Sequence, residues 1–127
     1  MQLMPGTAKD MAKKLNLPHD LDRLIKDPAY NARLGSAYLA KLIDEFGPYY
    51  PFVATGYNAG PRRPKRWLEQ FGDPRRSTET AVDWIEHIPF RETRNYAMRV
   101  MESLAIYRAR LSGKTEPLHL SRDLVGR

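Results

Sequence analysis

Two short segments of this chain carry the side chains best suited to chemistry. The first, Gly56-Tyr57-Asn58-Ala59-Gly60-Pro61, sets a tyrosine and an asparagine among small residues. The phenol of Tyr57 and the amide of Asn58 suit hydrogen bonds to a neutral polar ligand. A packed tyrosine at the C-terminal end of a helix explains the same residues without a ligand, so both interpretations stay open.

The second segment holds two glutamates, Glu86 at the end of one expected helix and Glu92 near the start of the next. A carboxylate in the first turn complements the helix dipole, so Glu92 has a structural interpretation as a cap or as a partner of Arg91 or Arg94. Glu86 can equally be a solvated charge. His87 has no partner at metal-ligand spacing, so the sequence predicts neither a metal site nor a cofactor.

A third candidate is a group of basic residues that flank Trp67 in the sequence. It comprises Arg62, Arg63, Lys65, Arg66, Arg75 and Arg76. Together with the formal net charge of +6, this group fits an acidic polymer such as nucleic acid, anionic lipid or a carboxylate-bearing glycan. Ordinary solubility explains the same charges without a partner.

The elements that position these residues are predicted to be helices. Asp27-Pro28 is a strong start signal, since aspartate caps helices and proline favours their first position. From there apolar residues recur every four positions up to Phe46, which predicts one long helix over 28–46 that Gly47-Pro48 ends. A second long helix is expected over 90–111.

Shorter helices are expected between and before these two. Their ranges are 8–15, 20–25, 51–59, 64–71 and a segment that Thr78 or Thr80 can cap and that ends before Pro89. Thr7 is expected to cap the first helix. No segment alternates apolar and polar residues, so the predicted fold class is all-α, with several short helices around two long ones. Residues 113–127 are polar and are expected to form a tail or a loose wrap on the surface.

Composition limits the remaining possibilities. With 127 residues the chain can form one domain at most. It has no cysteine, so disulfides and thiolate catalysis are excluded. No apolar stretch approaches the length of a membrane span. The first residues also lack the pattern of a secretory signal, so export would need a leader outside this chain or an indirect route.

Taken in order, several segments of the chain resemble the soluble lytic murein transglycosylase family. They are 1–8, Asp27-Pro28 with Asn31 and Gly35, Tyr38-Leu39, 57–61 with Trp67-Leu68, and 86–96 with Tyr107-Arg108. The resemblance implies an all-α, lysozyme-like fold over 1–112, followed by the polar tail 113–127.

The resemblance also implies a reaction and a partner. Members of the family cleave the β-1,4 bond between N-acetylmuramic acid and N-acetylglucosamine in peptidoglycan strands without adding water, and they form a 1,6-anhydro sugar. One glutamic acid acts first as acid and then as base, which differs from the usual pair of carboxylates. An apolar setting must keep that acid protonated near neutral pH. The full-length protein would work in the periplasm or cell envelope.

In the family the catalytic glutamate is followed by serine and lies upstream of the segment that matches Met1–Ala8. The resemblance therefore implies that the acid maps before Met1, that this chain contains no catalytic residue, and that its domain lacks the N-terminal catalytic helix. It assigns sugar-binding roles to Gln2, Met4, Tyr57, Asn58 and Glu86, and structural roles to Glu92 and Arg94. Many members have glycine where this chain has Arg62.

Four functions remain open from the sequence. The first is a lytic transglycosylase domain without its own acid, and the second is a non-catalytic peptidoglycan-binding module. The third is a basic helical domain that binds nucleic acid, although net charge does not predict the order of the matching segments. The fourth is a hydrolase on the same fold, which would add water to its products. We expect the chain to bind peptidoglycan glycan strands, not nucleic acid, and to contain no membrane span.

Overall fold

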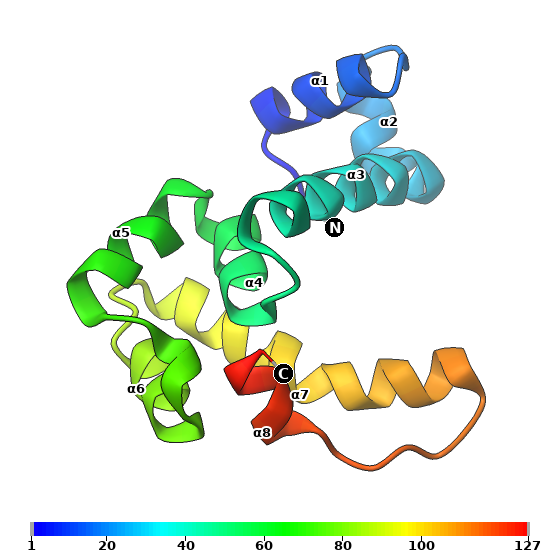
Figure 1. The fold of residues 1–127 in the computed structure, drawn as a ribbon. Helices are drawn as coiled ribbons and strands as arrows, with labels where there is room; N and C mark the ends of the chain where they lie inside the picture. The colour runs from blue at the N-terminus through cyan, green and yellow to red at the C-terminus, as the bar shows by residue number, and fades with distance from the viewer. Residues whose placement is uncertain (1, 127) are drawn as a thin grey trace. The chain divides into compact units, whose positions relative to one another are not determined.

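The computed structural model describes residues 2–126, and these form eight α-helices and one 3₁₀ helix with no β-strand among them (Figure 1). The all-α prediction is therefore confirmed. The chain divides into two compact units, Met1–Glu45 and Phe46–Arg127, and each is described by itself. Within the described residues no helix is long and apolar enough to cross a membrane.

The first unit consists of α1 (Pro5–Lys14), α2 (Leu21–Lys26) and nearly all of α3 (Pro28–Phe46). The predicted apolar stripe of α3 is confirmed, because every fourth residue from Tyr30 through Leu34 and Tyr38 to Leu42 is buried.

The start of α1 differs from the prediction. The helix begins at Pro5 with Met4 as its N-cap, and no side chain caps it. Thr7 lies inside the first turn and is not the cap. The fixed backbone angle of proline suits the first helical position, which explains why the helix begins two residues before Thr7.

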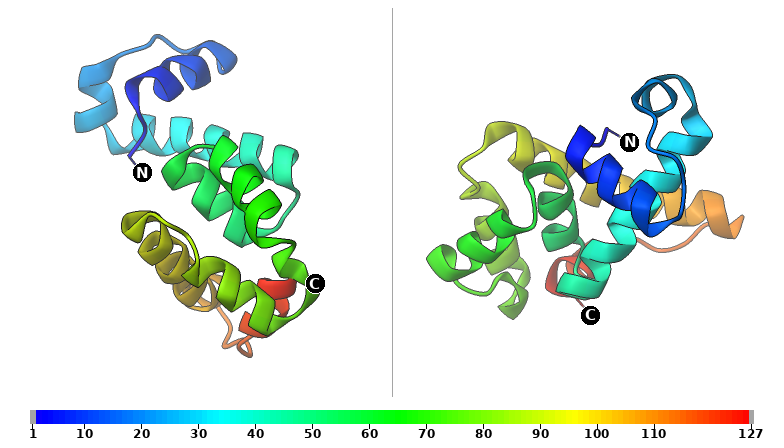
Figure 2. Two further views of the ribbon diagram at one scale, coloured as in Figure 1. Left: turned by 90° about the vertical axis from the view of Figure 1, so that its left-hand side faces the viewer. Right: turned by 90° about the horizontal axis from the view of Figure 1, so that it is seen from above.

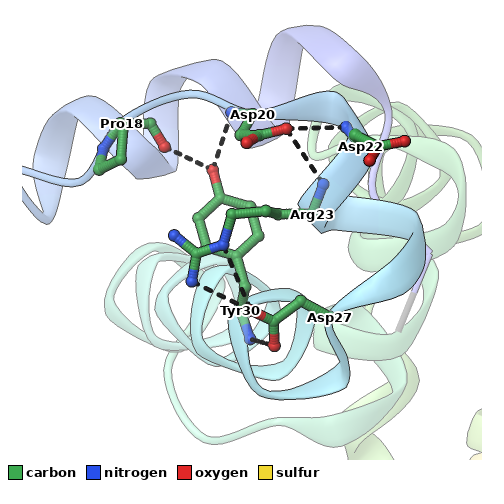
Figure 3. A network of polar contacts seen from close by, with 6 residues as sticks. All are labelled: Pro18, Asp20, Asp22, Arg23, Asp27 and Tyr30. Atoms are coloured by element: carbon green, nitrogen blue, oxygen red, sulfur yellow. Dashed lines mark hydrogen bonds and ion pairs between the residues drawn. The ribbon is translucent and has the colours of Figure 1, made fainter.

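Tyr30 ties α3 to the segment between α1 and α2 (Figure 3). Its phenol donates a hydrogen bond to the carbonyl of Pro18 at 2.7 Å and accepts one from the backbone N–H of Asp20 at 3.2 Å. The Asp20 carboxylate in turn caps α2. These bonds fix the loop that leads from α1 into α2.

Asp27 caps α3 as the sequence predicts. Its carboxylate accepts a hydrogen bond from the backbone N–H of Tyr30 at 3.1 Å and pairs with Arg23 at 3.0 Å. The Tyr30 N–H and then the Arg23 side chain hold the pKa of Asp27 below its usual value. The Arg23 guanidinium also lies 4.5 Å from the centre of the Tyr30 ring.

The second unit contains the remaining helices. They are α4 (Tyr50–Ala59), α5 (Arg62–Phe71), the 3₁₀ helix η1 (Pro74–Arg76), α6 (Thr78–Glu86), α7 (Arg91–Ser112) and α8 (Leu120–Val125). As predicted, α4 is nearly all buried, from Pro51 to Gly56. It packs against α7 and α5 (Figure 1), and Gly60 ends it in a conformation with φ of 90° that glycine adopts without strain.

Aromatic rings fill the centre of the second unit. Phe52 lies 5.2 Å from Trp84 and 4.7 Å from Tyr49, measured between ring centres. Trp67 lies 6.2 Å from Trp84 and 5.7 Å from Phe90. The tilted and edge-on angles of these pairs are those that aromatic quadrupoles favour. This cluster holds α4, α5, α6 and the start of α7 together.

The N-terminus of α6 also differs from the prediction. Ser77 is the cap, and its hydroxyl accepts the backbone N–H of Thr80 at 3.2 Å. The Thr80 hydroxyl accepts the Ser77 N–H at 2.9 Å, which completes a capping box. The threonine expected as a cap is therefore its reciprocal partner.

Residues near the C-terminus form more than a polar tail. Helix α8 packs against α6, η1, α7 and α4 (Figure 2), and Leu124 on it is buried in the aromatic core. The Tyr49 hydroxyl donates a hydrogen bond to the Leu124 carbonyl at 2.8 Å. Arg108 of α7 forms two hydrogen bonds with Asp123, at 2.6 and 2.9 Å. The sequence did not indicate these contacts, because they depend on partners far away in the sequence.

Candidate functional site

The residues that the sequence singled out fall in both units. Gln2 and Met4 belong to the first, where Gln2 is exposed and Met4 is 75 % exposed. Gln2 lines a pocket of about 480 Å³. The other residues of this pocket are Leu3, Leu24, Ile25, Pro28, Asn31 and Ala32. Its mixed apolar and amide lining suits the faces and edges of a polar ring.

In the second unit, Asn58 is joined to the first turn of α7. Its side-chain oxygen accepts a hydrogen bond from the Thr93 hydroxyl at 2.7 Å, and its amide nitrogen lies 3.5 Å from a carboxylate oxygen of Glu92. Thr93 is only 2 % exposed, so its hydroxyl needs this acceptor. The pair fixes which way the Asn58 amide points and leaves one of its two N–H groups for a ligand.

Glu92 therefore contacts Asn58, and not one of the arginines considered from the sequence. Within residues 2–126 no ion pair with Arg94 is recorded, and the contact of its carboxylate is with Asn58. Glu92 also lies in the first turn of α7, where its charge complements the helix dipole. It serves as a link between α4 and α7.

Tyr57 lies one residue before Asn58 and is half-buried. Its ring is nearly parallel to that of Tyr96 of α7, at an angle of 6° with 6.5 Å between ring centres. Burial raises the pKa of Tyr96, so its phenol is neutral at physiological pH. The ring pair is a second contact between α4 and α7, in addition to the one from Asn58 to Thr93.

Arg94 fixes the turn between α6 and α7. Its guanidinium donates hydrogen bonds to the backbone carbonyls of Ile88 at 3.1 Å and Glu86 at 3.4 Å. Carbonyls at the end of a helix lack partners within the helix, so these bonds satisfy groups that would otherwise need water. The position of Glu86 relative to α7 thus depends on Arg94.

The Glu86 side chain lies on a groove of about 210 Å³ formed by α6, α7 and α8. The groove also contains Val82, Ile85, Met98, Met101, Glu102, Leu120 and Leu124. Its lining is apolar apart from the two glutamates. No recorded contact within residues 2–126 joins the Glu86 carboxylate to Tyr57 or Asn58. The sequence did not reveal this groove, since α8 forms one wall of it.

The carboxyl groups of the chain differ in their surroundings. All seven glutamates are exposed. At Asp73, hydrogen bonds from the Arg75 side chain lower the pKa to about 2. In the described part of the chain no group of three or more acidic or histidine side chains could hold a metal ion.

Substitution of Thr93 by valine tests the link to Asn58. We expect the free energy of unfolding of the second unit to fall by about 1 kcal/mol, because a buried hydrogen bond is lost without a change of shape. Urea denaturation measures this loss. Thr93→Ser keeps the hydroxyl and serves as the control, and equal stability of the valine variant and the wild-type chain would contradict the assignment.

Comparison with known proteins agrees with this fold. The family model of the Transglycosylase SLT domain matches residues 1–80. Because this match covers more than half of the chain, the chain belongs to the Transglycosylase SLT domain family.

Two relatives carry names of the same family. The chain is 37 % identical over 109 residues to the soluble lytic murein transglycosylase of Escherichia coli K12, a match that covers 85 % of this chain and 16 % of that protein. It is 34 % identical over 128 residues to a putative soluble lytic murein transglycosylase of Haemophilus influenzae, covering 100 % of this chain and 21 % of that protein. The chain thus spans about a fifth or less of these relatives.

Two solved structures are similar to this one. One is an inactive glutamate-to-glutamine mutant of the lytic transglycosylase Slt from Pseudomonas aeruginosa, at 38 % identity and a TM-score of 0.76, with 93 % of this chain and 18 % of that one covered. The other is the 70 kDa soluble lytic transglycosylase SLT70 from Escherichia coli, at 34 % identity and a TM-score of 0.74, covering 91 % and 18 %.

Proposed function

We propose that this chain is the part of a peptidoglycan lytic transglycosylase that holds the glycan strand, and that none of its own glutamates is the catalytic acid. The observation that carries the proposal is the fixed Asn58 amide beside Tyr57. Membership of the SLT family and the names of the relatives support peptidoglycan as the substrate, and the cell envelope as its place of action.

The chemistry of the proposed reaction sets the requirement for an acid. Cleavage of the bond between N-acetylmuramic acid and N-acetylglucosamine needs a proton on the glycosidic oxygen. The resulting carboxylate then takes the proton of the muramic 6-hydroxyl, which attacks the anomeric carbon and gives a 1,6-anhydro sugar. A single carboxyl group performs both steps, provided that it starts protonated.

The exposure of all seven glutamates argues against any of them in this role. Glu86 is the strongest candidate by position, yet it is exposed at the edge of its groove. In the Pseudomonas relative, the mutant with glutamine in place of a glutamate is inactive. We propose that the catalytic acid that works with this chain is a residue outside positions 1–127.

The residues of the chain then bind and orient the strand. The free N–H of the Asn58 amide donates to an acceptor on the sugar, and the rings of Tyr57 and Tyr96 offer apolar surface to a sugar face. Glu86 accepts hydrogen bonds from sugar hydroxyls. In the first unit, taken by itself, Gln2 and Met4 offer an amide and a thioether to a sugar ring.

Substitution of Asn58 by alanine tests this function directly. We expect binding to purified peptidoglycan sacculi to weaken about tenfold, since the ligand loses one hydrogen bond and Thr93 loses its acceptor. Co-sedimentation of the chain with sacculi measures the affinity.

Asn95→Ala provides the matched control, because Asn95 is an exposed asparagine on α7 with no recorded partner in the described residues. Circular dichroism must show that both variants keep their helices. Equal affinities of Asn58→Ala and Asn95→Ala would contradict the proposed site.

A further inference from the structure

Three arginines on α5 form a surface that the proposed function does not use. They are Arg62, Arg63 and Arg66, called here the arginine face, and all three are exposed. Residues three and four positions apart lie on the same side of a helix, so Arg66 is a neighbour of both others. The first turn of α5 contains no acidic residue.

The charges of the arginine face lack ion-pair partners. Elsewhere arginines pair closely with aspartates, as Arg75 does with Asp73 at 2.7 Å and Arg108 with Asp123 at 2.6 Å. No ion pair within residues 2–126 is recorded for any member of the arginine face. Its positive charges are therefore available to an external anion.

One member of the face is held in place by an aromatic ring. The Arg63 guanidinium lies 4.8 Å from the centre of the Phe90 ring, and Phe90 packs on the buried Trp67. Stacking orients a guanidinium and leaves its N–H groups at the edge free to donate. An arginine that is already oriented loses less freedom when it binds a carboxylate.

The arginine face adjoins the Asn58 site. Arg62 follows the C-terminal end of α4 after only Gly60 and Pro61. Phe90, whose ring stacks with Arg63, directly precedes α7. The third residue of α7, Thr93, donates its hydrogen bond to Asn58. The Arg63–Phe90 contact and the Asn58–Thr93 hydrogen bond thus join the same two regions. One region is the link from α4 to α5, and the other is the start of α7.

We propose that the arginine face binds carboxylates of the peptide stems carried by the glycan strand held at Asn58. This inference rests on the proposed function. The sugars themselves are uncharged when their stems are attached, so three unpaired cations next to a sugar site need another ligand. Arginine forms paired hydrogen bonds with carboxylates, and stem peptides carry several of them.

The face would make the domain prefer strands with free stem carboxylates. The test measures affinity for soluble, uncross-linked glycan strands in two forms, native and with the stem carboxylates chemically converted to amides. We expect the wild-type chain to bind the native strands about tenfold more tightly at low salt, and this preference to shrink as salt is added.

The variant R62Q/R63Q/R66Q should bind both forms with the affinity that the wild-type chain has for the amidated strands. A matched variant, R99Q/R110Q/K114Q, removes the same amount of positive charge from exposed positions on and after α7. It should keep most of the preference, which separates a local site from general attraction to a basic protein.

Each other outcome overturns the inference in a recognisable way. Binding of both strand forms without preference, or equal loss in the two triple variants, refutes the role of the arginine face while the proposed function stands. Failure to bind either form refutes the proposed function and this inference with it. If a 20-base-pair DNA duplex binds the arginine face more tightly than native strands do, the face is a phosphate site instead.

Discussion

Substitution of Trp84 by alanine is expected to lower the free energy of unfolding of the unit Phe46–Arg127 by about 3–5 kcal/mol. Trp84 is 2 % exposed and contacts both Phe52 and Trp67. Its removal leaves a cavity where α4, α5 and α6 meet, and the surrounding rings cannot close it without moving the helices. Urea denaturation followed by circular dichroism measures the loss.

Trp84→Phe is the control for this variant. The indole N–H of Trp84 is buried and has no hydrogen-bond partner among the described residues, so phenylalanine loses volume but no hydrogen bond. We expect it to cost about 1–2 kcal/mol. An alanine variant within 1 kcal/mol of the wild-type chain would show that the aromatic cluster does not hold this unit together.

Substitution of Leu124 by alanine is expected to cost about 2–4 kcal/mol. Leu124 is 6 % exposed and belongs to the core cluster, although α8 has only six residues. A helix this short is not stable alone, so it depends on packing. Without the Leu124 side chain, α8 should detach from Tyr49, and limited proteolysis should cleave within residues 113–119.

Leu118 provides a control of the same residue type in the same segment, since it is 81 % exposed. Leu118→Ala should change stability by less than 0.5 kcal/mol, as surface substitutions usually do. If the two alanine variants are equally stable, residues 113–126 are the loose tail that the sequence predicts.

The sequence predicted the long helices because their signals are local. The cap Asp27 directly precedes α3, and the four-residue spacing from Tyr30 to Leu42 lies within the helix itself. Burial along α7 is less regular, since Ala97 and Met101 are buried but Leu111 is 87 % exposed. The periodic pattern indicates a helix, but it does not say whether each apolar residue finds a partner.

The contacts of α8 could not be read from the sequence for a different reason. Its anchors, the Tyr49 hydroxyl and the Arg108 guanidinium, lie 75 and 15 residues away from their partners. With only two spaced leucines on α8, no periodic pattern marks the helix. Its position is decided by tertiary packing, which local propensity does not describe.

The candidate site was predicted residue by residue, but its contacts were not. Tyr57, Asn58 and Glu86 were singled out by type and by resemblance, whereas Thr93 was not, although it holds Asn58 in place from 35 residues away. A small polar residue in a first helical turn has many common roles, so its type alone gave no signal. The groove beside Glu86 was missed together with α8.

The central claim is that this chain holds peptidoglycan but does not cleave it with its own glutamates, all of which are exposed. The most direct test is to incubate the purified chain with sacculi and to analyse the soluble products by mass spectrometry. We predict that the chain sediments with the sacculi and that no 1,6-anhydromuropeptides are released. Release of these products by the wild-type chain, and its loss in Glu86→Gln, would contradict the claim and make Glu86 the acid.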